Sequence, residues 1–378
     1  MKVLVLNAGS SSLKFSLTNT ATRRHEIRGS VERIGLEGPV LKLGGEETPV
    51  AAADHRAALV EVLRRIPREE VTAVGHRVVH GGGFTASSLI TEEVLGRLEA
   101  YSHLAPLHNP ANIAGIRAAL SALPEVPQVA VFDTAFHQTM PERAWRYAIP
   151  RELADEHGFR RYGFHGTSHR YVSQRLAELL GRPLEELRLI VLHLGNGASA
   201  SAVSRGRSVD TSMGFTPMEG LVMGTRSGDV DPGLVLELAR RLGVEKAGEL
   251  LNKQSGLLGL AGYQDLRDLH RAVAAGDAAA REALEVYTYR IKKYVGAYAA
   301  AMGGLEAIAF TAGVGENDPE VRRLSLEGLE FLGLELDPKA NAAGGPRISR
   351  AGSRVEVWVV PTDEELAIAL DTERVLES

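Results

Sequence analysis

Two stretches of this chain, half its length apart, share one pattern, and this repeat constrains the fold more than any other feature. VLVLNAGSSS at residues 3–12 aligns with LIVLHLGNGAS at residues 189–199, with Gly9 opposite Gly195 and an offset of 186 residues. Each copy is a buried-strand run followed by one polar residue, a glycine turn and small residues. Two unrelated hairpins are the plainer interpretation, because a strand followed by Gly and Ser is common. A duplicated domain whose two turns face one cleft is the sharper one.

Strand and helix signals alternate along the rest of the chain, which predicts an α/β fold. A length of 378 residues predicts two or three domains. Apolar runs predict strands at residues 3–6, 13–17, 71–74, 129–132 and 307–310, the first two paired as a hairpin. We expect helices at residues 112–123, at 168–180 with Ser168 as N-cap and Gly181 as C-cap, and at 278–302 before Gly303 and Gly304.

Composition and charge exclude several classes of protein and site. The chain has no cysteine, which rules out disulfide scaffolds, thiolate zinc sites, iron–sulfur clusters and cysteine nucleophiles. It has 43 basic and 48 acidic residues, whereas a general nucleic-acid binder normally has a basic excess. The N-terminal apolar run is too short for a signal peptide, and no stretch approaches the roughly 18 apolar residues of a membrane span. We therefore expect a cytoplasmic protein with no nucleic-acid or membrane partner.

Glycine-rich turns predict phosphate binding of a particular kind. The turns at residues 9–12 and 195–197 expose backbone N–H groups that an anion can approach. The chain has no G-x-x-x-x-G-K-[ST] motif, and Gly313-Val314-Gly315 lacks the third glycine of a dinucleotide fingerprint. The remaining interpretation is a nucleotide whose phosphates are held by hairpin turns.

Two arginines and one aspartate lie where they could meet such phosphates. Arg77 follows an apolar run and precedes three glycines, and Arg226 lies in the Gly-rich stretch 210–233. Guanidinium forks match phosphoryl oxygens and stay charged at any working pH. Asp133 follows a predicted strand, the usual position of a functional carboxylate in an α/β sheet. A surface arginine and a capping or turn aspartate are the plainer interpretations.

Two histidines four residues apart raise the question of a metal. His165 and His169 lack the intervening Glu of an HExxH motif, and no predicted helix spans both. We instead expect His165 to precede a helix N-terminus, a natural anion site, and His169 to be structural. Near the C-terminus, Thr362 as N-cap would place Glu365 in a capping box. Glu364 would then be free to hold Mg²⁺ with Asn7, both being hard oxygen ligands.

Eight segments, taken together, closely resemble the signature segments of the acetate kinase family. They are NAGSSSLKF, HRVVHGG, FDTAFH, YGFHGTSH, HLGNGAS, DTSMGFTPMEGLVMGTRSGDVDPG, GVGEN and TDEELAIA, in the family's order from residue 1 to near residue 370. The resemblance implies a two-lobed, duplicated ribonuclease H-like fold of the actin and hexokinase type around a central cleft. It implies a homodimer that reversibly transfers a phosphoryl group from ATP to acetate, giving acetyl phosphate and ADP.

The resemblance also implies a division of labour between two lobes. Residues 1–140 with 366–378 would form an N-terminal lobe on the acyl-substrate and metal side. Residues 141–365 would form a C-terminal lobe on the nucleotide side. The implied cofactor is Mg²⁺, with Mn²⁺ able to replace it, and ATP or ADP is the co-substrate.

Each candidate site residue takes a role by the same resemblance. Asn7 and Glu364 match the metal positions. Arg77 matches the carboxylate-binding arginine and Asp133 the catalytic acidic residue, while His165 and Arg226 match the transition-state stabilisers. Val79, Leu107, Phe164 and Pro217 match the apolar pocket for the acetate methyl group. The nucleotide contacts match Lys14, the phosphate loop at residues 193–197 (His193, Leu194, Gly195, Asn196, Gly197), Asp265, Leu266, Arg267, Gly313, Val314, Gly315, Glu316 and Asn317.

Two departures from the family pattern affect these assignments. Gln264 precedes Asp265 where the family commonly has a Ser-Ser-Asp run, which concerns the nucleotide contacts. Asp363 stands where Asn is usual, which adds a carboxylate beside Glu364.

The proposed chemistry separates the family from other readings. Acetate is ionised at pH 7, so direct in-line transfer needs no general base, and Asp133 would orient an arginine or a metal-bound water. Propionate kinase is the main alternative, because one methylene is worth only ~1–3 kcal/mol of discrimination, and butyrate kinase is more distant. A non-catalytic actin-like protein would have lost the cleft charges. The cleft charges are all in place here, which argues against that alternative. A sugar kinase would need a carboxylate base and a polar pocket, and the implied apolar pocket argues against it.

Overall fold

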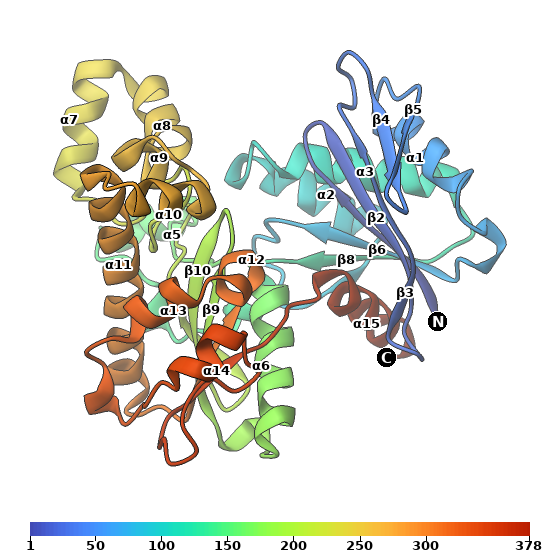
Figure 1. Cartoon of the computed structure of the whole chain (residues 1–378). Coiled ribbons are helices and arrows are strands. Elements are labelled where there is room, and N and C mark those ends of the chain that lie inside the picture. Colours follow the sequence, from blue (N-terminus) through green and yellow to red (C-terminus); the bar gives the residue numbers. More distant parts are fainter. The chain divides into compact units, whose positions relative to one another are not determined.

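The computed structural model describes all 378 residues and divides into two compact units. The first unit comprises Met1–Gln138, Gly166–Ser168 and Asp363–Ser378, and the second comprises Thr139–His165 and His169–Thr362. The second unit is therefore inserted into the first, whose last helix comes from the end of the chain (Figure 1).

The sheet of the first unit has a mixed order that puts three parallel strands side by side. Its order is β5 (Glu46–Pro49), β4 (Val40–Leu43), β3 (Arg24–Glu32), β2 (Ser12–Asn19), β1 (Lys2–Ala8), β6 (Ala73–Val78), β8 (Gln128–Phe132) and β7 (Ser88–Leu89). Strands β1, β6 and β8 run parallel, and the predicted hairpin of β1 with β2 is confirmed. Parallel neighbours bring their carboxyl ends to one edge of the sheet.

The sheet of the second unit repeats this arrangement. Its order is β11 (Arg207–Thr211), β10 (Ala198–Ser204), β9 (Arg188–Leu194), β12 (Ala307–Thr311) and β13 (Glu356–Val359). The order third–second–first–fourth–fifth matches that of β3, β2, β1, β6 and β8, with the same parallel and antiparallel pairs. Strands β1 and β9 begin and end 186 residues apart, so the predicted duplication in an α/β fold is confirmed.

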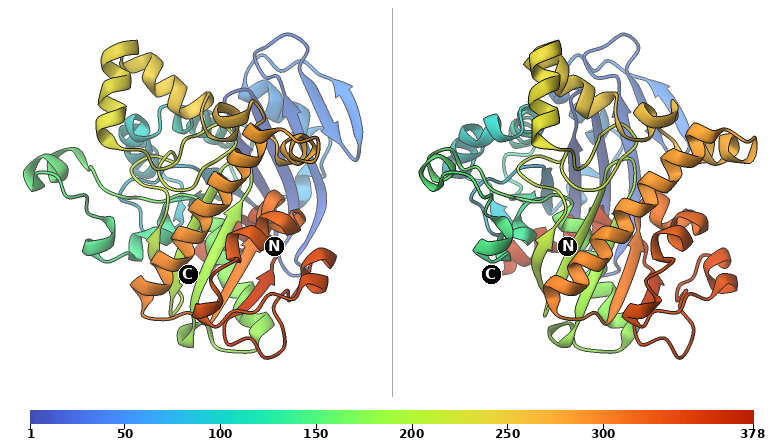
Figure 2. Two further views of the ribbon diagram at one scale, coloured as in Figure 1. Left: turned by 60° about the vertical axis from the view of Figure 1, so that its left-hand side comes forward. Right: turned by 90° about the vertical axis from the view of Figure 1, so that its left-hand side faces the viewer.

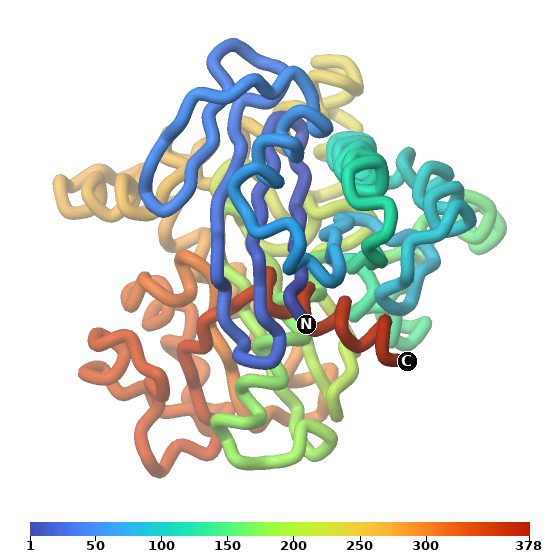
Figure 3. Tube along the Cα trace, turned by 90° about the vertical axis from the view of Figure 1, so that its right-hand side faces the viewer, coloured from blue at the N-terminus to red at the C-terminus, as the bar shows by residue number.

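The central strands of the first sheet are buried on both faces, and the alternating side chains of β1 enter two different cores. On one face, Leu4 and Leu6 of β1 join a core with Ala118 of α3 (Asn109–Ala122) and with α1 (His55–Leu63). On the other, Val3 and Val5 pack with Ile368 of α15 (Glu364–Glu377). Figure 3 shows the two chain ends close together, and the Met1 amine lies 3.2 Å from Glu373.

A long helix accompanies the strands of the second unit. Figure 2 shows α11 (Ala278–Met302) running alongside them, and α11 contacts β9 and β10. Tyr287, Ile291 and Val295 recur every four residues on its buried face. Gly303 ends the helix in a left-handed conformation with φ of 69°, so the predicted helix and its stop are confirmed.

Shorter helices complete the two units. They are α2 (Glu92–Ala100), α4 (Glu142–Trp145), α5 (Arg151–His157), α6 (Gly166–Leu180), α7 (Pro232–Leu242), α8 (Val244–Lys253), α9 (Gly256–Ala261), α10 (Leu266–Ala274), α12 (Ala312–Asn317), α13 (Pro319–Leu326) and α14 (Pro338–Ala343). None of the chain's helices combines the length and the apolar character needed to cross a membrane.

Three predicted helix starts are wrong, for local reasons. Helix α3 begins at Asn109 rather than at residue 112, with Pro110 in its first turn, where proline is tolerated. Helix α6 begins at Gly166 rather than after Ser168. His165 has a left-handed conformation with φ of 55°, so the helix cannot extend further toward the N-terminus. Helix α15 is capped by Asp363, whose side chain accepts a 3.0 Å bond from the Leu366 N–H, so Thr362 is not the N-cap. Glu365 pairs instead with Arg28, Nε to Oε2 2.7 Å.

One predicted strand is displaced along the chain. Residues 71–74 were expected to form it, but β6 runs from Ala73 to Val78 because Val71 closes a 3₁₀ turn and Ala73 pairs with Val3. The consequence is that Arg77 lies within the strand rather than in the loop after it.

Candidate active site

Polar residues gather at the carboxyl edge of the first unit's sheet. Asn7 lies near the end of β1, Arg77 near the end of β6, and Asp133 directly follows β8. The pairing of Leu6 with His76 brings Asn7 and Arg77 to neighbouring positions. This edge is where α/β sheets place functional side chains.

Arg77 and Asp133 form a two-pronged ion pair. Arg77 Nε lies 3.1 Å from Asp133 Oδ1, and Nη2 lies 2.7 Å from Oδ2. Burial raises the pKa of Asp133, which is 2% exposed, and the Arg77 guanidinium opposes that rise. The Asp133 carboxylate in turn raises the pKa of Arg77. Both oxygens of Asp133 are occupied, so this carboxylate is placed to orient Arg77 rather than to collect a proton.

The same edge offers oxygen ligands for a divalent cation. Helix α15 packs on β1, and the charge of its first residue, Glu364, raises the pKa of both Asp133 and Arg77. No group of three His, Asp or Glu side chains is arranged to hold a metal. Mg²⁺ is usually bound by one or two carboxylates, waters and substrate phosphates, and the Asn7 amide and the Glu364 carboxylate are oxygen ligands of the kind that could hold it. Lys14, which is exposed, lies opposite Asn7 in the register of the β1–β2 hairpin.

In the second unit, His165 and Arg226 border the predicted phosphate loop, residues 193–197. His165 precedes α6 as we expected, and its ring stacks on that of His193 with 4.2 Å between centroids. A Cβ atom placed on Gly197 would lie 3.6 Å from His165 Nε2 and 3.8 Å from Arg226 Nη1. The imidazole and the guanidinium therefore both border the loop backbone.

Arg226 is a half-buried cation that has no carboxylate partner. Its Nη1 donates a 2.8 Å bond to the carbonyl of Pro217 and contacts Met223 Sδ. Burial lowers the pKa of Arg226, yet a guanidinium remains charged at neutral pH. A buried charge is costly unless it is paired, so this position suits an anionic ligand.

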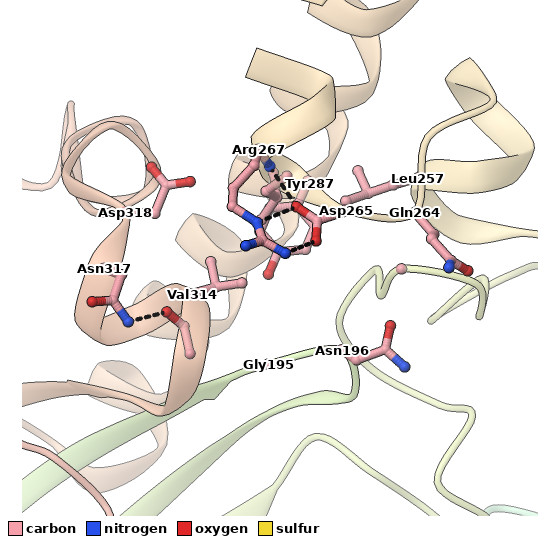
Figure 4. A pocket seen from close by; sticks show the side chains of 13 residues that line it. Gly195, Asn196, Leu257, Gln264, Asp265, Arg267, Tyr287, Val314, Asn317 and Asp318 are labelled. Carbon is pink, nitrogen blue, oxygen red and sulfur yellow. Dashed lines mark hydrogen bonds and ion pairs between the residues drawn. The ribbon is translucent and has the colours of Figure 1, made fainter. Parts of the chain in front are cut away.

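A cavity of about 590 Å³ opens beside the loop (Figure 4). It is lined by Gly195, Asn196, Gly224, Leu257, Gln264, Asp265, Leu266, Arg267, Tyr287, Gly313, Val314, Asn317 and Asp318. Asp265 caps α10 and holds Arg267 through bonds of 3.0 and 2.6 Å. Figure 4 shows Asn196 and Gln264 on one side of this pair and Asn317 on the other. The volume lies within the ~300–1,000 Å³ typical of small-molecule sites.

The sequence indicated most of this lining, but not all of it. The motif residues at 195–196, 265–267, 313–314 and 317 line the cavity. Gly224, Leu257, Gln264, Tyr287 and Asp318 also line it and were missed. Asp318 is the N-cap of α13 before Pro319, a signal that was available. Tyr287 lies on the buried face of α11, where an aromatic residue reads as core.

Other candidate residues have positions of their own. Gly315 is buried within α12, and the Glu316 carboxylate accepts bonds from the backbone N–H groups of Ala312 and Thr362. The four residues expected around the acetate methyl group belong to different units, with Val79 and Leu107 in the first and Phe164 and Pro217 in the second. Leu107 is 66% exposed, whereas Phe164 is buried.

Comparison with known proteins gives one consistent family. A sequence profile described as the Acetokinase family matches residues 2–370. A protein named acetate kinase from Coprothermobacter proteolyticus is 54% identical and aligns over 98% of each chain. The crystal structure of Porphyromonas gingivalis acetate kinase superposes with a TM-score of 0.95 at 48% identity over 99% of each chain. A propionate kinase from Francisella tularensis subsp. tularensis SCHU S4 superposes with 0.94 at 42% identity, again over 99% of each chain.

Proposed function

This chain belongs to the acetokinase family and phosphorylates acetate with ATP, and we propose that the phosphoryl group passes directly from nucleotide to acetate with no phosphoenzyme. The observation that carries the proposal is Arg226, a half-buried guanidinium beside the phosphate loop without a protein carboxylate. Such a cation is available to the oxygens of a transferred phosphoryl group.

The reaction requires positive charge in the active site rather than a general base. Acetate is already ionised at neutral pH, so the difficulty lies in bringing two anions together and stabilising a loose, in-line transition state. We assign the acetate carboxylate to Arg77, which Asp133 orients through two bonds. We assign the phosphoryl oxygens to Arg226 and to Nε2 of His165, which both border Gly197.

The metal and the nucleotide complete the proposal. Asn7 and Glu364 would hold Mg²⁺, or Mn²⁺ in its place, and the ion supplies positive charge to the nucleotide phosphates when bound. The cavity lined by Asp265, Arg267 and Gly313 would take the nucleoside of ATP or ADP. We also place the reaction in the cytoplasm, where these co-substrates are found.

The decisive experiment is acyl phosphate formation trapped with hydroxylamine, with acetate, propionate and butyrate compared side by side. We expect strict dependence on ATP and Mg²⁺ and the highest kcat/KM for acetate. A preference for propionate would keep the mechanism and change the preferred substrate, since a methylene changes binding by only ~1–3 kcal/mol. A phosphorylated protein recovered after rapid quenching would overturn direct transfer.

A substitution at Gly313 should block the nucleotide without disturbing the protein. An added Cβ at Gly313 meets no atom within 4 Å, although this glycine lines the cavity. Gly313→Leu should therefore raise the KM for ATP about tenfold or more, a binding loss of ~1.4 kcal/mol, with the KM for acetate and the Tm unchanged. Gly313→Ala is the matched control, with a smaller effect. An unchanged KM for ATP in Gly313→Leu would place the nucleotide elsewhere.

A homodimer is the second part of the proposal, and one helix supports it. None of the residues of α7 is buried. The apolar side chain of Leu236 on this helix is 72% exposed, and that of Val244, which begins α8, is 75% exposed. Helices α7 and α8 contact each other, and exposed apolar side chains on such a pair mark an interaction surface, to which we assign a second copy of the chain.

Leu236→Glu should therefore convert the dimer into a monomer, because a carboxylate is costly to bury in an apolar contact. Sedimentation equilibrium measures the mass directly. Leu36→Glu is the control, since Leu36 is 58% exposed but lies in the first unit. Equal masses for wild type and Leu236→Glu would remove α7 from the interface.

A further inference from the structure

The hydroxyl of Ser199 lies between two histidine rings. Its Oγ is 2.8 Å from His165 Nδ1 and 2.7 Å from His169 Nε2. Ser199 is the second residue of β10 and is completely buried, so no solvent competes for these bonds. The i, i+4 pair of histidines thus converges on a serine hydroxyl.

A hydroxyl has one proton, and this limits how the three groups can be arranged. Ser199 can donate a hydrogen bond to a nitrogen of one ring while its oxygen accepts a hydrogen bond from the N–H of the other ring. If it donates to His165 Nδ1, the neutral His165 ring must carry its proton on Nε2. In the opposite arrangement, the neutral ring would present a lone pair at Nε2.

The position of Nε2 decides between the two arrangements. This nitrogen borders the Gly197 backbone together with Arg226 Nη1, where we assigned the phosphoryl oxygens. A lone pair there would repel an anion, whereas an N–H would donate to it. The His193 ring stacks on the His165 ring and limits its rotation, so the Ser199 contact also sets where Nε2 points.

We propose that Ser199 is a positioning residue that fixes His165 as the Nε2–H tautomer, with this N–H directed at the phosphate loop. The identity of the acceptor as a phosphoryl group rests on the proposed function. The choice of tautomer rests on it too, because the contacts among Ser199, His165 and His169 by themselves allow both arrangements.

The test combines a spectroscopic measurement with kinetics on a matched pair of variants. Ser199→Ala removes the bridging hydroxyl. Ser201→Ala is the control, because Ser201 is equally buried on the same face of β10 but bonds Thr211 Oγ1 at 2.9 Å. Nitrogen NMR of ¹⁵N-histidine-labelled protein, recorded near pH 8, distinguishes protonated from unprotonated ring nitrogens. The signals of His165 are those that His165→Asn removes.

In the wild type we expect His165 protonated at Nε2 and unprotonated at Nδ1. Ser199→Ala should give a mixture of tautomers and lower kcat by about 10- to 100-fold, as removal of an orienting partner commonly does, with both KM values within about twofold. Ser201→Ala should keep the tautomer and kcat. Protonation at Nδ1 in the wild type, or an unchanged kcat in Ser199→Ala, would overturn the proposal. A protein that formed no acetyl phosphate would instead refute the proposed function, and the NMR result would stand.

Discussion

Arg226→Ala should lower kcat for acetyl phosphate formation by about 100- to 1000-fold, the usual cost of removing one electrostatic contact from a transition state. Arg226 makes no ion pair with the protein, and its Nη1 bonds only the Pro217 carbonyl and Met223 Sδ. Removing its charge therefore leaves no carboxylate of the protein unpaired. Burial lowers the pKa of Arg226, which means that holding this charge costs folding free energy. We expect the Tm of Arg226→Ala to equal or exceed that of the wild type.

The kinetic assay uses trapped acyl phosphate, and calorimetry gives the Tm. Arg226→Lys keeps the charge but loses the two-pronged geometry, so we expect a rate between wild type and Arg226→Ala. Arg323→Ala is the control, since this exposed arginine pairs with Glu320 on α13. A kcat for Arg226→Ala within about threefold of wild type would refute the role assigned to this residue.

Arg77→Ala should have the largest effect on stability, about 3 to 5 kcal/mol in the free energy of unfolding, besides its loss of activity. The substitution leaves the Asp133 carboxylate buried without its counter-charge. Arg77→Ala combined with Asp133→Asn removes the stranded charge, so the double variant should recover most of the stability but none of the activity. Urea unfolding measures both variants.

The pH dependence of Arg77→Ala gives an independent check with a defined sign. Burial already raises the pKa of Asp133 above its ordinary 3.8, and loss of Arg77 removes the main influence that lowers it. The folded variant then binds a proton more tightly than the unfolded chain does. Its stability relative to wild type should improve as pH falls from about 8 toward 4, because protonation neutralises the buried carboxylate. A deficit that grew on acidification would show that Asp133 is not the source.

Local signals predicted the parts of the fold that local interactions determine. The end of helix 278–302 was predicted from Gly303, which directly follows the last helical residue. The repeat of β1 and β9 was readable because each copy carries its own strand and turn. The start of α6 was missed because histidine seldom has a left-handed conformation, and nothing in the neighbouring sequence indicates that His165 has one.

The candidate site also contains some residues that local motifs predict and others that only the fold brings together. Arg226, Asp133 and the phosphate loop stand in recognisable motifs. Ser199 was missed as a partner of His165 because 34 residues separate them and only the second unit's fold brings them together. Gln264 and Tyr287 share the cavity wall although they come from different segments, which no spacing rule predicts.

The insertion of the second unit into the first has a consequence for synthesis. The apolar face of the first sheet that carries Val3 and Val5 is covered by Ile368 and Ala369, near the end of the chain. During translation, the residues that cover this face are synthesised only after the whole second unit. The second unit can fold as it is made, but this face of the first unit is covered only when α15, which follows the second unit in the chain, becomes available. Strands made before the second unit thus depend for their cover on a helix made after it.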